Sequence, residues 1–269
     1  MADHVPWRRA TSLTGTDRLA LGLMIGIPLV LHLALVWVPT LASAALSFSS
    51  WDGIGGPEDI EWVGFLNYEQ IFTVYPRFWP AAWNNLLWLG FLAVLPTMFG
   101  LLLAVLLDRK LRFGRLYQSV LYLPMVLALA LVGFIWQLMY QPDHGLVNNL
   151  LELAGVAGDK PVAWLGNPDI NIYAVLVAAG WRHAGYVMLL YLAGLKSMDS
   201  ALKEAAALDG ANGWQTFWRV TFPVLKPINV VVGVVTVIEA LRAFDIVYAI
   251  NKGRNGLELV SVLITDNIR

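Results

Sequence analysis

Long apolar segments with little or no formal charge constrain the fold of this chain more than any other feature. Residues 19–48, 86–107 and 119–140 contain no Asp, Glu, Lys or Arg, residues 172–195 contain one Arg, and residues 228–250 contain three charged side chains. A helix needs about 20 mainly apolar residues to cross the hydrocarbon of a bilayer. Each of these segments meets that length, so we predict an all-α, polytopic membrane protein with five spans.

The composition agrees with a membrane protein. The chain is 58% hydrophobic and 14% charged, whereas soluble domains carry about 25% charged residues. It has no cysteine, which excludes a disulfide framework and a thiolate metal site. The sequence contains no basic patch with interleaved aromatic residues of the kind that would favour nucleic-acid binding. We therefore expect the lipid bilayer as a partner, and we expect no metal site and no nucleic acid.

Basic residues in the connecting segments predict the orientation, because cytoplasmic loops carry an excess of Lys and Arg. Eleven stand before the first span, between spans two and three, or between spans four and five: Arg8, Arg9, Arg18, Arg109, Lys110, Arg112, Arg115, Lys196, Lys203, Arg219 and Lys226. Five stand on the other side: Arg77, Lys160, Lys252, Arg254 and Arg269. We predict a cytoplasmic N-terminal segment (1–18), then one transmembrane domain (19–269) with a cytoplasmic loop at 197–226.

The cytoplasmic loop carries the most specific motif. It reads Glu204-Ala205-Ala206-Ala207-Leu208-Asp209-Gly210, and Pro223 follows thirteen residues after the glycine. Small alanine side chains let a helix lie close to a partner surface, and Gly210 permits a sharp reversal because it tolerates positive φ. Pro223 marks the re-entry into the fifth span, since proline cannot continue a helix interior. An ordinary cytoplasmic helix–turn–helix with a solvated Glu is the alternative; the spacing and the flanking spans favour a docking element.

This spacing resembles the signature loop of ABC-importer permease subunits, and further segments extend the resemblance over almost the whole chain. They are similar to carbohydrate-type permeases of the maltose and glycerol-phosphate class, and include Trp62-Val63-Gly64-Phe65-Leu66-Asn67-Tyr68, Gly145-Leu146-Val147-Asn148, Leu192-Ala193-Gly194-Leu195 and Phe244-Asp245. The resemblance implies the type I ABC importer permease fold and a place in the bacterial cytoplasmic (inner) membrane. The family has a sixth core helix, expected but absent from this sequence; either the sequence is truncated or this helix is not represented in it. Residues 252–256 also replace the Gly-Gly-Pro stretch that is usual after span five.

The resemblance also implies partners. It implies two ATP-binding subunits, a second homologous permease subunit, and an extracytoplasmic solute-binding protein that docks on residues 49–83 and 141–171. The ATPase-coupling residues it implies are Glu204, Ala205, Ala206, Asp209, Gly210 and Pro223. The chain lacks the Gly-x4-Gly-Lys-Ser/Thr loop that holds nucleotide phosphates, and a Gly-Lys dipeptide does not occur in it. We therefore expect no catalytic residue and no cofactor here, with ATP and Mg²⁺ bound by the partner subunits.

Charged residues inside the spans are candidates for the substrate path, because they usually face a cavity, the bundle interior or an opposite charge. Glu239, Arg242 and Asp245 stand three apart and would share one broad face of a continuous helix. Tyr248 and Asn251 continue this side. Two interpretations stay open: a structural ladder that satisfies itself, or a path that hydrogen-bonds to sugar hydroxyls.

The second and fourth spans add further polar candidates. Arg182 lies mid-span, with Tyr186 one turn later. It either pairs with a carboxylate of another helix or belongs to the substrate path. We expect Asn84 and Asn85 to cap the start of the second span rather than to contact substrate.

These observations predict a permease subunit of an ATP-driven importer for a sugar or oligosaccharide, working by alternating access. The main alternative is a secondary transporter of a polar solute that uses Glu239 or Asp245 as a proton site. A scaffold subunit that transports nothing is a further alternative. A membrane-embedded enzyme is disfavoured, because no nucleophile or metal constellation occurs in the sequence.

Overall fold

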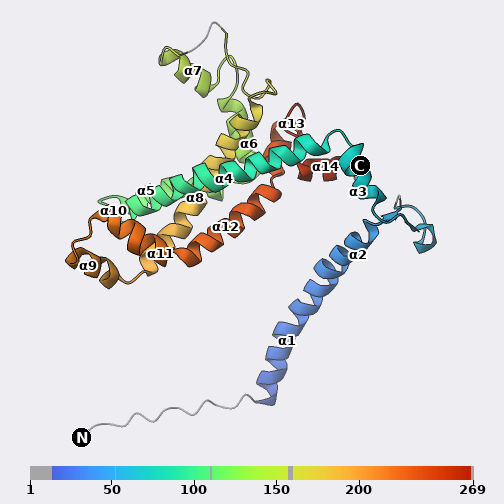
Figure 1. Ribbon diagram of the computed structural model, residues 1–269, viewed down its shortest axis with the longest axis horizontal. Helices are drawn as coiled ribbons and strands as arrows, with labels where there is room; N and C mark the ends of the chain where they lie inside the picture. Colours follow the sequence, from blue (N-terminus) through green and yellow to red (C-terminus); the bar gives the residue numbers. More distant parts are fainter. Residues whose placement is uncertain (1–13, 52, 110, 157–159, 268–269) are drawn as a thin grey trace. The chain divides into compact units, whose positions relative to one another are not determined.

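The computed structural model describes residues 14–51, 53–109, 111–156 and 160–267. The contacts divide the chain into two units, Met1–Tyr75 and Pro76–Arg269, each described here by itself (Figure 1). Several residues of the predictions lie outside the described residues, namely Arg8, Arg9, Lys110 and Arg269 of the charge count and residues 1–13 of the N-terminal segment.

The first unit begins with a long apolar helix. It passes through α1 (Gly15–His32), a π-helical stretch η1 (Leu33–Trp37) and α2 (Val38–Leu46) without a break. Thr14 starts it with a capping box, in which its side chain accepts from the Asp17 N–H and Asp17 bonds back. These 32 residues are long and apolar enough to cross a membrane. No residue of this helix is buried within the protein, so its apolar surface is available to lipid or to another chain.

A small polar module completes the first unit. Strand β1 (Ser49–Ser50) pairs antiparallel with β2 (Glu61–Trp62), and a 3-10 turn η2 (Pro57–Asp59) and helix α3 (Leu66–Thr73) flank them. The Asn67 amide donates to the carbonyls of Ser47 (3.0 Å) and Ser49 (2.8 Å). An aromatic cluster packs beside these bonds and consists of Phe48, Trp62, Phe65 and Tyr68. The segment from Trp62 to Tyr68 is therefore part of a folded module.

The second unit is helical throughout its described part. Its elements are α4 (Phe78–Leu107), α5 (Gly114–Val126), α6 (Leu129–Met139), α7 (Leu146–Leu153), α8 (Asn171–Ser197), α9 (Ser200–Leu208), α10 (Gly213–Thr216), the π-helical η3 (Phe217–Thr221), α11 (Phe222–Val224), α12 (Lys226–Leu241), α13 (Asp245–Asn251) and α14 (Val260–Asn267). Figure 1 shows α4, α5, α8 and α12 side by side, with α9–α11 at one end and α13 and α14 toward the other.

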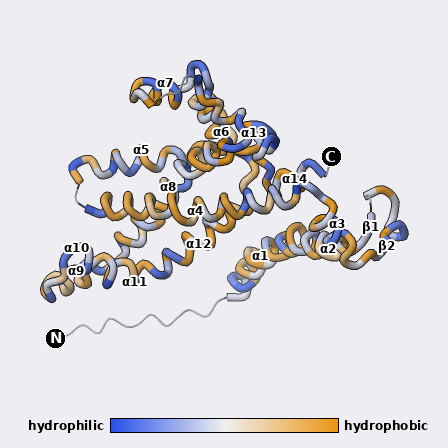
Figure 2. Tube along the Cα trace, turned by 45° about the horizontal axis from the view of Figure 1, so that its top comes forward, coloured by the Kyte–Doolittle hydropathy of each residue, from blue (hydrophilic) through white to orange (hydrophobic). Residues whose placement is uncertain are grey.

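Helix α8 is the centre of this unit, and small residues let it approach α4 closely. A Cβ added at Gly100 of α4 would lie 2.8 Å from the Ala184 carbonyl oxygen and 2.9 Å from the Val187 Cβ of α8. Membrane helices use such small residues because lipid provides no hydrophobic drive between them and close backbone packing must supply it. Figure 2 shows that most residues along α4 are hydrophobic.

Two predicted spans are interrupted helices. Among the described residues, three helices are long and apolar enough to cross a membrane: Gly15–Leu46, Phe78–Leu107 and Asn171–Ser197. A fourth candidate is the pair α5 and α6, which bend by 100° at residues 127 and 128, where the backbone is extended. The predicted fifth span is not one helix, because α12 ends at Leu241 and α13 begins at Asp245.

Side chains of α4 bond to the backbone at the end of α12 and around the start of α14. The Asn85 amide donates to the Ala240 carbonyl (3.2 Å), and its oxygen accepts from the Val260 N–H (2.9 Å). Asn84 donates to the Gly256 and Glu258 carbonyls, both at 2.9 Å. The prediction that these asparagines cap α4 is therefore wrong: α4 begins at Phe78, and both lie inside it, bonded to chain about 155 to 175 residues away.

Candidate functional site

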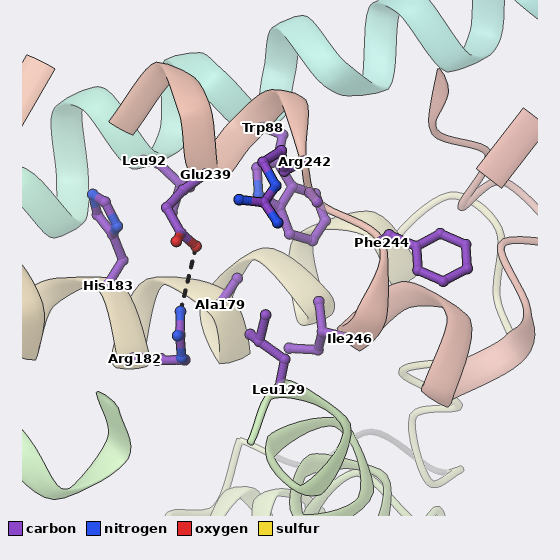
Figure 3. Close-up of a pocket in the computed structure, with 11 residues that line it drawn as sticks. Trp88, Leu92, Leu129, Ala179, Arg182, His183, Glu239, Arg242, Phe244 and Ile246 are labelled. Carbon is purple, nitrogen blue, oxygen red and sulfur yellow. Dashed lines mark hydrogen bonds and ion pairs between the residues drawn. The ribbon is translucent and has the colours of Figure 1, made fainter. Parts of the chain in front are cut away.

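An ion pair between two packed helices marks the polar centre of the second unit. Arg182 of α8 and Glu239 of α12 approach to 3.4 Å (Nη1 to Oε2), with side chains 14% and 37% exposed (Figure 3). The prediction that Arg182 pairs with a carboxylate of another helix is confirmed. The Nε of Arg182 is buried and has no hydrogen-bond partner among the described residues, so one donor of this guanidinium is available within the protein interior.

A second polar contact fixes the neighbouring histidine. His183 Nε2 lies 3.1 Å from Thr236 Oγ1, which lies 2.7 Å from the Val232 carbonyl oxygen. A hydroxyl has one proton, and donation to the carbonyl uses it. The hydroxyl oxygen therefore accepts from His183, which assigns the proton to Nε2. His183 is a tether between α8 and α12 rather than a free donor for a solute.

These groups line a small cavity together with Arg242, the residue that follows the end of α12. Its lining residues are Trp88, Leu92, Leu129, Ala179, Arg182, His183, Glu239, Arg242, Ala243, Phe244 and Ile246 (Figure 3). The cavity holds about 30 Å³, close to the share of one water in the liquid. Arg242 is exposed and forms no ion pair with a described residue. A sugar does not fit this cavity in the conformation described.

The continuous charged face predicted on the fifth span is wrong. The helix breaks after Leu241, so Asp245 opens α13 and is not among the cavity residues. Tyr248 stacks on Phe244, with ring centroids 4.9 Å apart. Asn251 holds the turn after α13, donating to the Arg254 carbonyl (2.7 Å) and accepting from the Gly253 N–H (3.1 Å).

The structure therefore brings together part of the predicted substrate path. Arg182, Glu239 and Arg242 share the cavity, whereas Tyr186 is not among the residues that line it. The break after Leu241 places Asp245, Tyr248 and Asn251 on the separate short helix α13. It has no bearing on Tyr186, which lies in α8. A role of any of these residues in transport stays a prediction.

The motif segment forms a short capped helix. The Asp199 carboxylate accepts from the Ala201 N–H (2.9 Å) and starts α9, which contains Glu204, Ala205 and Ala206. The helix ends in a Schellman motif: the Gly210 N–H donates to the Ala207 carbonyl (3.1 Å) and the Ala211 N–H to the Ala206 carbonyl (2.9 Å). This motif needs a residue with positive φ, and Gly210 has φ +79°. The predicted reversal at Gly210 is confirmed.

The segment continues as helical turns up to α12. Asn212 forms a capping box with Gln215 at the start of α10. Pro223 lies in α11, which follows the π-helical η3 without a break, so it stands inside a helical run and the prediction that it marks the start of the fifth span is wrong: α12 begins at Lys226. One predicted coupling residue faces inward, since Ala206 is buried, whereas Glu204, Ala205, Asp209 and Gly210 are exposed.

Two features of this segment escaped the sequence reasoning. Lys203 binds Asp108 at the end of α4 (Nζ to Oδ2 2.7 Å), so α9 is tied to the membrane helices. Leu208, the last residue of α9, is 90% exposed, and Trp214 is 72% exposed. The Lys203–Asp108 pair could not be predicted, because its residues lie 95 positions apart in the sequence. Leu208 could have been noticed as an apolar residue inside a polar loop. Exposed apolar side chains on a polar segment indicate a partner surface.

Comparisons with known proteins agree on one family. The family described as "Binding-protein-dependent transport system inner membrane component" matches residues 96–268. The "Xylose/arabinose import permease protein" of Haloferax volcanii is 37% identical over 243 residues, which cover 89% of this chain and 75% of that protein. The "Trehalose/maltose transport system permease protein" of Thermococcus litoralis is 32% identical over 200 residues, covering 74% and 66%.

A solved structure shows the same fold. It is a bacterial alginate ABC transporter in complex with an alginate pentasaccharide-bound periplasmic protein, and one of its chains matches with a TM-score of 0.77 and 22% identity. The match covers 93% of this chain and 83% of that chain. At this identity the likeness establishes the fold.

Proposed function

Because this chain belongs to the family of binding-protein-dependent transport system inner membrane components, we propose that it forms one half of the membrane pathway of an ATP-driven importer for a sugar or oligosaccharide. Members of this family are the permease components of their transport systems and are not the catalytic components. Two relatives are named for pentoses and for disaccharides, which favours a carbohydrate over other polar solutes.

The coupling part of the proposal rests on one observation, the exposed turn at the end of α9. The Schellman motif fixes its shape, and the Lys203–Asp108 ion pair links it to α4. Leu208 projects beside Gly210 with little contact to its own chain. We assign this turn to the ATPase interface, where Glu204 is placed to accept charge-assisted bonds from a basic residue of the partner.

We infer the orientation from the position of the basic loops. The end of α4, the start of α5, the end of α8 and helices α9–α11 all gather at one end of the second unit (Figure 1). Both loops that the positive-inside rule assigns to the cytoplasm are therefore at the same end, which supports a cytoplasmic site for the ATPase subunits. The first unit carries no such constraint, and its cytoplasmic N-terminus is proposed from Arg8, Arg9 and Arg18 alone.

A second permease subunit completes the pathway in this proposal. The cavity at Arg182, Glu239 and Arg242 is about 30 Å³, far below the 300–1,000 Å³ typical of a small-molecule site. Arg242 is exposed at its edge. We propose that the polar face becomes part of a larger chamber between two homologous subunits, and that Arg182 and Arg242 donate to hydroxyl groups of the sugar when this chamber opens.

The cycle we propose is alternating access. A solute-loaded receptor docks on residues 49–83 and 141–171, two ATPase subunits close on ATP and Mg²⁺, and the α9 turn transmits that closure to α4 and α8. Receptor and nucleotide act through their different affinities for the inward-open and outward-open states. Hydrolysis resets the assembly.

The experiment is reconstitution of the permease with its ATPase, second permease and receptor in proteoliposomes. We expect uptake of labelled pentoses or disaccharides only with ATP and receptor, and loss of receptor-stimulated ATP hydrolysis in Glu204→Arg with the subunit still in the membrane. Arg242→Ala is expected to change uptake while the ATPase stays bound. Uptake driven by a pH gradient without ATP would instead support the secondary transporter.

A further inference from the structure

A basic hollow lies where α4 and α8 end and α5 begins, beside the Lys203–Asp108 ion pair. It encloses about 560 Å³, and its cationic lining consists of Arg109, Arg112, Arg115 and Lys196. All four side chains are exposed. None of them forms an ion pair with a described residue, because the only carboxylate in the lining, Asp108, is bound by Lys203. Four like charges that gather without a counter-ion repel one another, so this arrangement favours an anionic ligand.

The rest of the hollow is apolar. Leu111, Phe113 and Leu116 line it and are exposed, and the Arg112 guanidinium lies 5.6 Å from the centre of the Phe113 ring. A free inorganic anion would gain nothing from such walls. A molecule with an anionic head and a hydrocarbon body would contact both kinds of surface.

A stripe of exposed aliphatic residues leads away from the hollow along α5. Leu116, Val120 and Leu123 are 60%, 59% and 59% exposed. Their spacing of four and three residues places them on one helix face. This face runs from the basic residues toward the middle of the predicted third span, which is the direction that an acyl chain takes below its head group.

We propose that this hollow is a binding site for an anionic phospholipid, whose phosphate is held by Arg112, Arg115 and Lys196 and whose acyl chains lie on the α5 stripe. Basic pockets between membrane helices at the cytoplasmic side are known to hold anionic head groups. The site adjoins the Lys203–Asp108 ion pair, so a bound lipid contacts the region where α9 joins the membrane helices.

The test is native mass spectrometry of the complete purified transporter titrated with dioleoylphosphatidylglycerol or dioleoylphosphatidylcholine. Each basic residue near an anionic group contributes a factor of about five in affinity. We expect the triple variant Arg112→Gln, Arg115→Gln, Lys196→Gln to bind phosphatidylglycerol at least tenfold more weakly, and its binding of phosphatidylcholine to stay the same. Arg112→Lys with Arg115→Lys keeps the charge and is expected to keep the preference.

A matched control removes three exposed cations elsewhere, with Arg18→Gln, Arg219→Gln and Lys226→Gln. It is expected to change phosphatidylglycerol binding less than twofold. Equal affinity of the wild type for both lipids would overturn the proposal. So would binding of water-soluble glycerol 1-phosphate as tightly as the lipid, which would make the ligand a free phosphate. Loss of the ATPase from the triple variant with its lipid retained would assign the hollow to a protein partner instead.

Discussion

Truncation of Leu208 tests how the coupling turn contacts its partner. This side chain ends α9 and is 90% exposed within the chain, so Leu208→Ala removes almost no contact with its own subunit. Surface substitutions of this kind change stability by about 0.5 kcal/mol or less. If the leucine is buried in the ATPase, its removal costs about 2 kcal/mol of binding, since a fully buried leucine contributes roughly 1.5–3 kcal/mol. That is about a thirtyfold weaker complex.

The assay is a binding titration of the purified permease pair with the ATPase in nanodiscs, alongside thermal unfolding of the permease alone. Leu153→Ala is the matched control, because Leu153 is 84% exposed and ends α7, far along the chain from the turn. We expect Leu208→Ala to weaken the complex about thirtyfold and Leu153→Ala not to affect it. Equal affinities for wild type and Leu208→Ala, with unchanged unfolding temperatures, would refute a buried leucine at this interface.

Three further substitutions probe other parts of the structure. Gly210→Ala is expected to lower the free energy of unfolding by about 1–2 kcal/mol, because alanine at φ +79° is strained even though nothing lies near its Cβ; thermal denaturation measures this, and an unchanged midpoint contradicts the Schellman geometry. Glu239→Gln is expected to cost about 1–3 kcal/mol because Arg182 loses its counter-charge, an effect that should vanish in the Arg182→Leu background. Asn85→Leu is expected to cost about 1–3 kcal/mol per orphaned backbone group, and unchanged hydrogen exchange at residues 240–260 would contradict it.

The long helices were predictable because each is a single apolar run. The fourth span, predicted at 172–195, is α8 at Asn171–Ser197, and the second, predicted at 86–107, shares its end with α4. The start of α4 was missed by eight residues. Arg77 is the N-cap of α4, and the first turns of the helix contain Pro80 and two asparagines. A count of apolar residues therefore places the start of the span after these polar residues, although the helix begins before them.

The interruption of the fifth span could not be read from the sequence. Residues 228–250 have the composition of a continuous span. At the break, Asn85 and Ser261 donate to the carbonyls of Ala240 and Ala243, and such long-range partners leave no local pattern in the sequence. Because the break was missed, the predicted polar face of the fifth span was also wrong. Arg182, Glu239 and Arg242 do meet, but Asp245 belongs to the next helix.

The coupling turn was the most predictable part of the site, because its geometry is local. A glycine six residues after Glu204 ends the helix by a motif that needs only neighbouring backbone groups. The burial of Ala206 and the ion pair of Lys203 depend on segments elsewhere in the fold. The exposed Leu208 was visible in the sequence as an apolar residue in a polar segment.

Site-specific cross-linking tests the central claim most directly. The sequence has no cysteine, so Leu208→Cys introduces a single thiol into it, and a photoreactive maleimide attached there reports which chain lies against the α9 turn. We predict a cross-link to the ATPase subunit that changes in yield when ATP binds, and none from Leu153→Cys. A probe at position 208 that labels only lipid or the solute-binding protein, in an assembly that still hydrolyses ATP, would contradict the account.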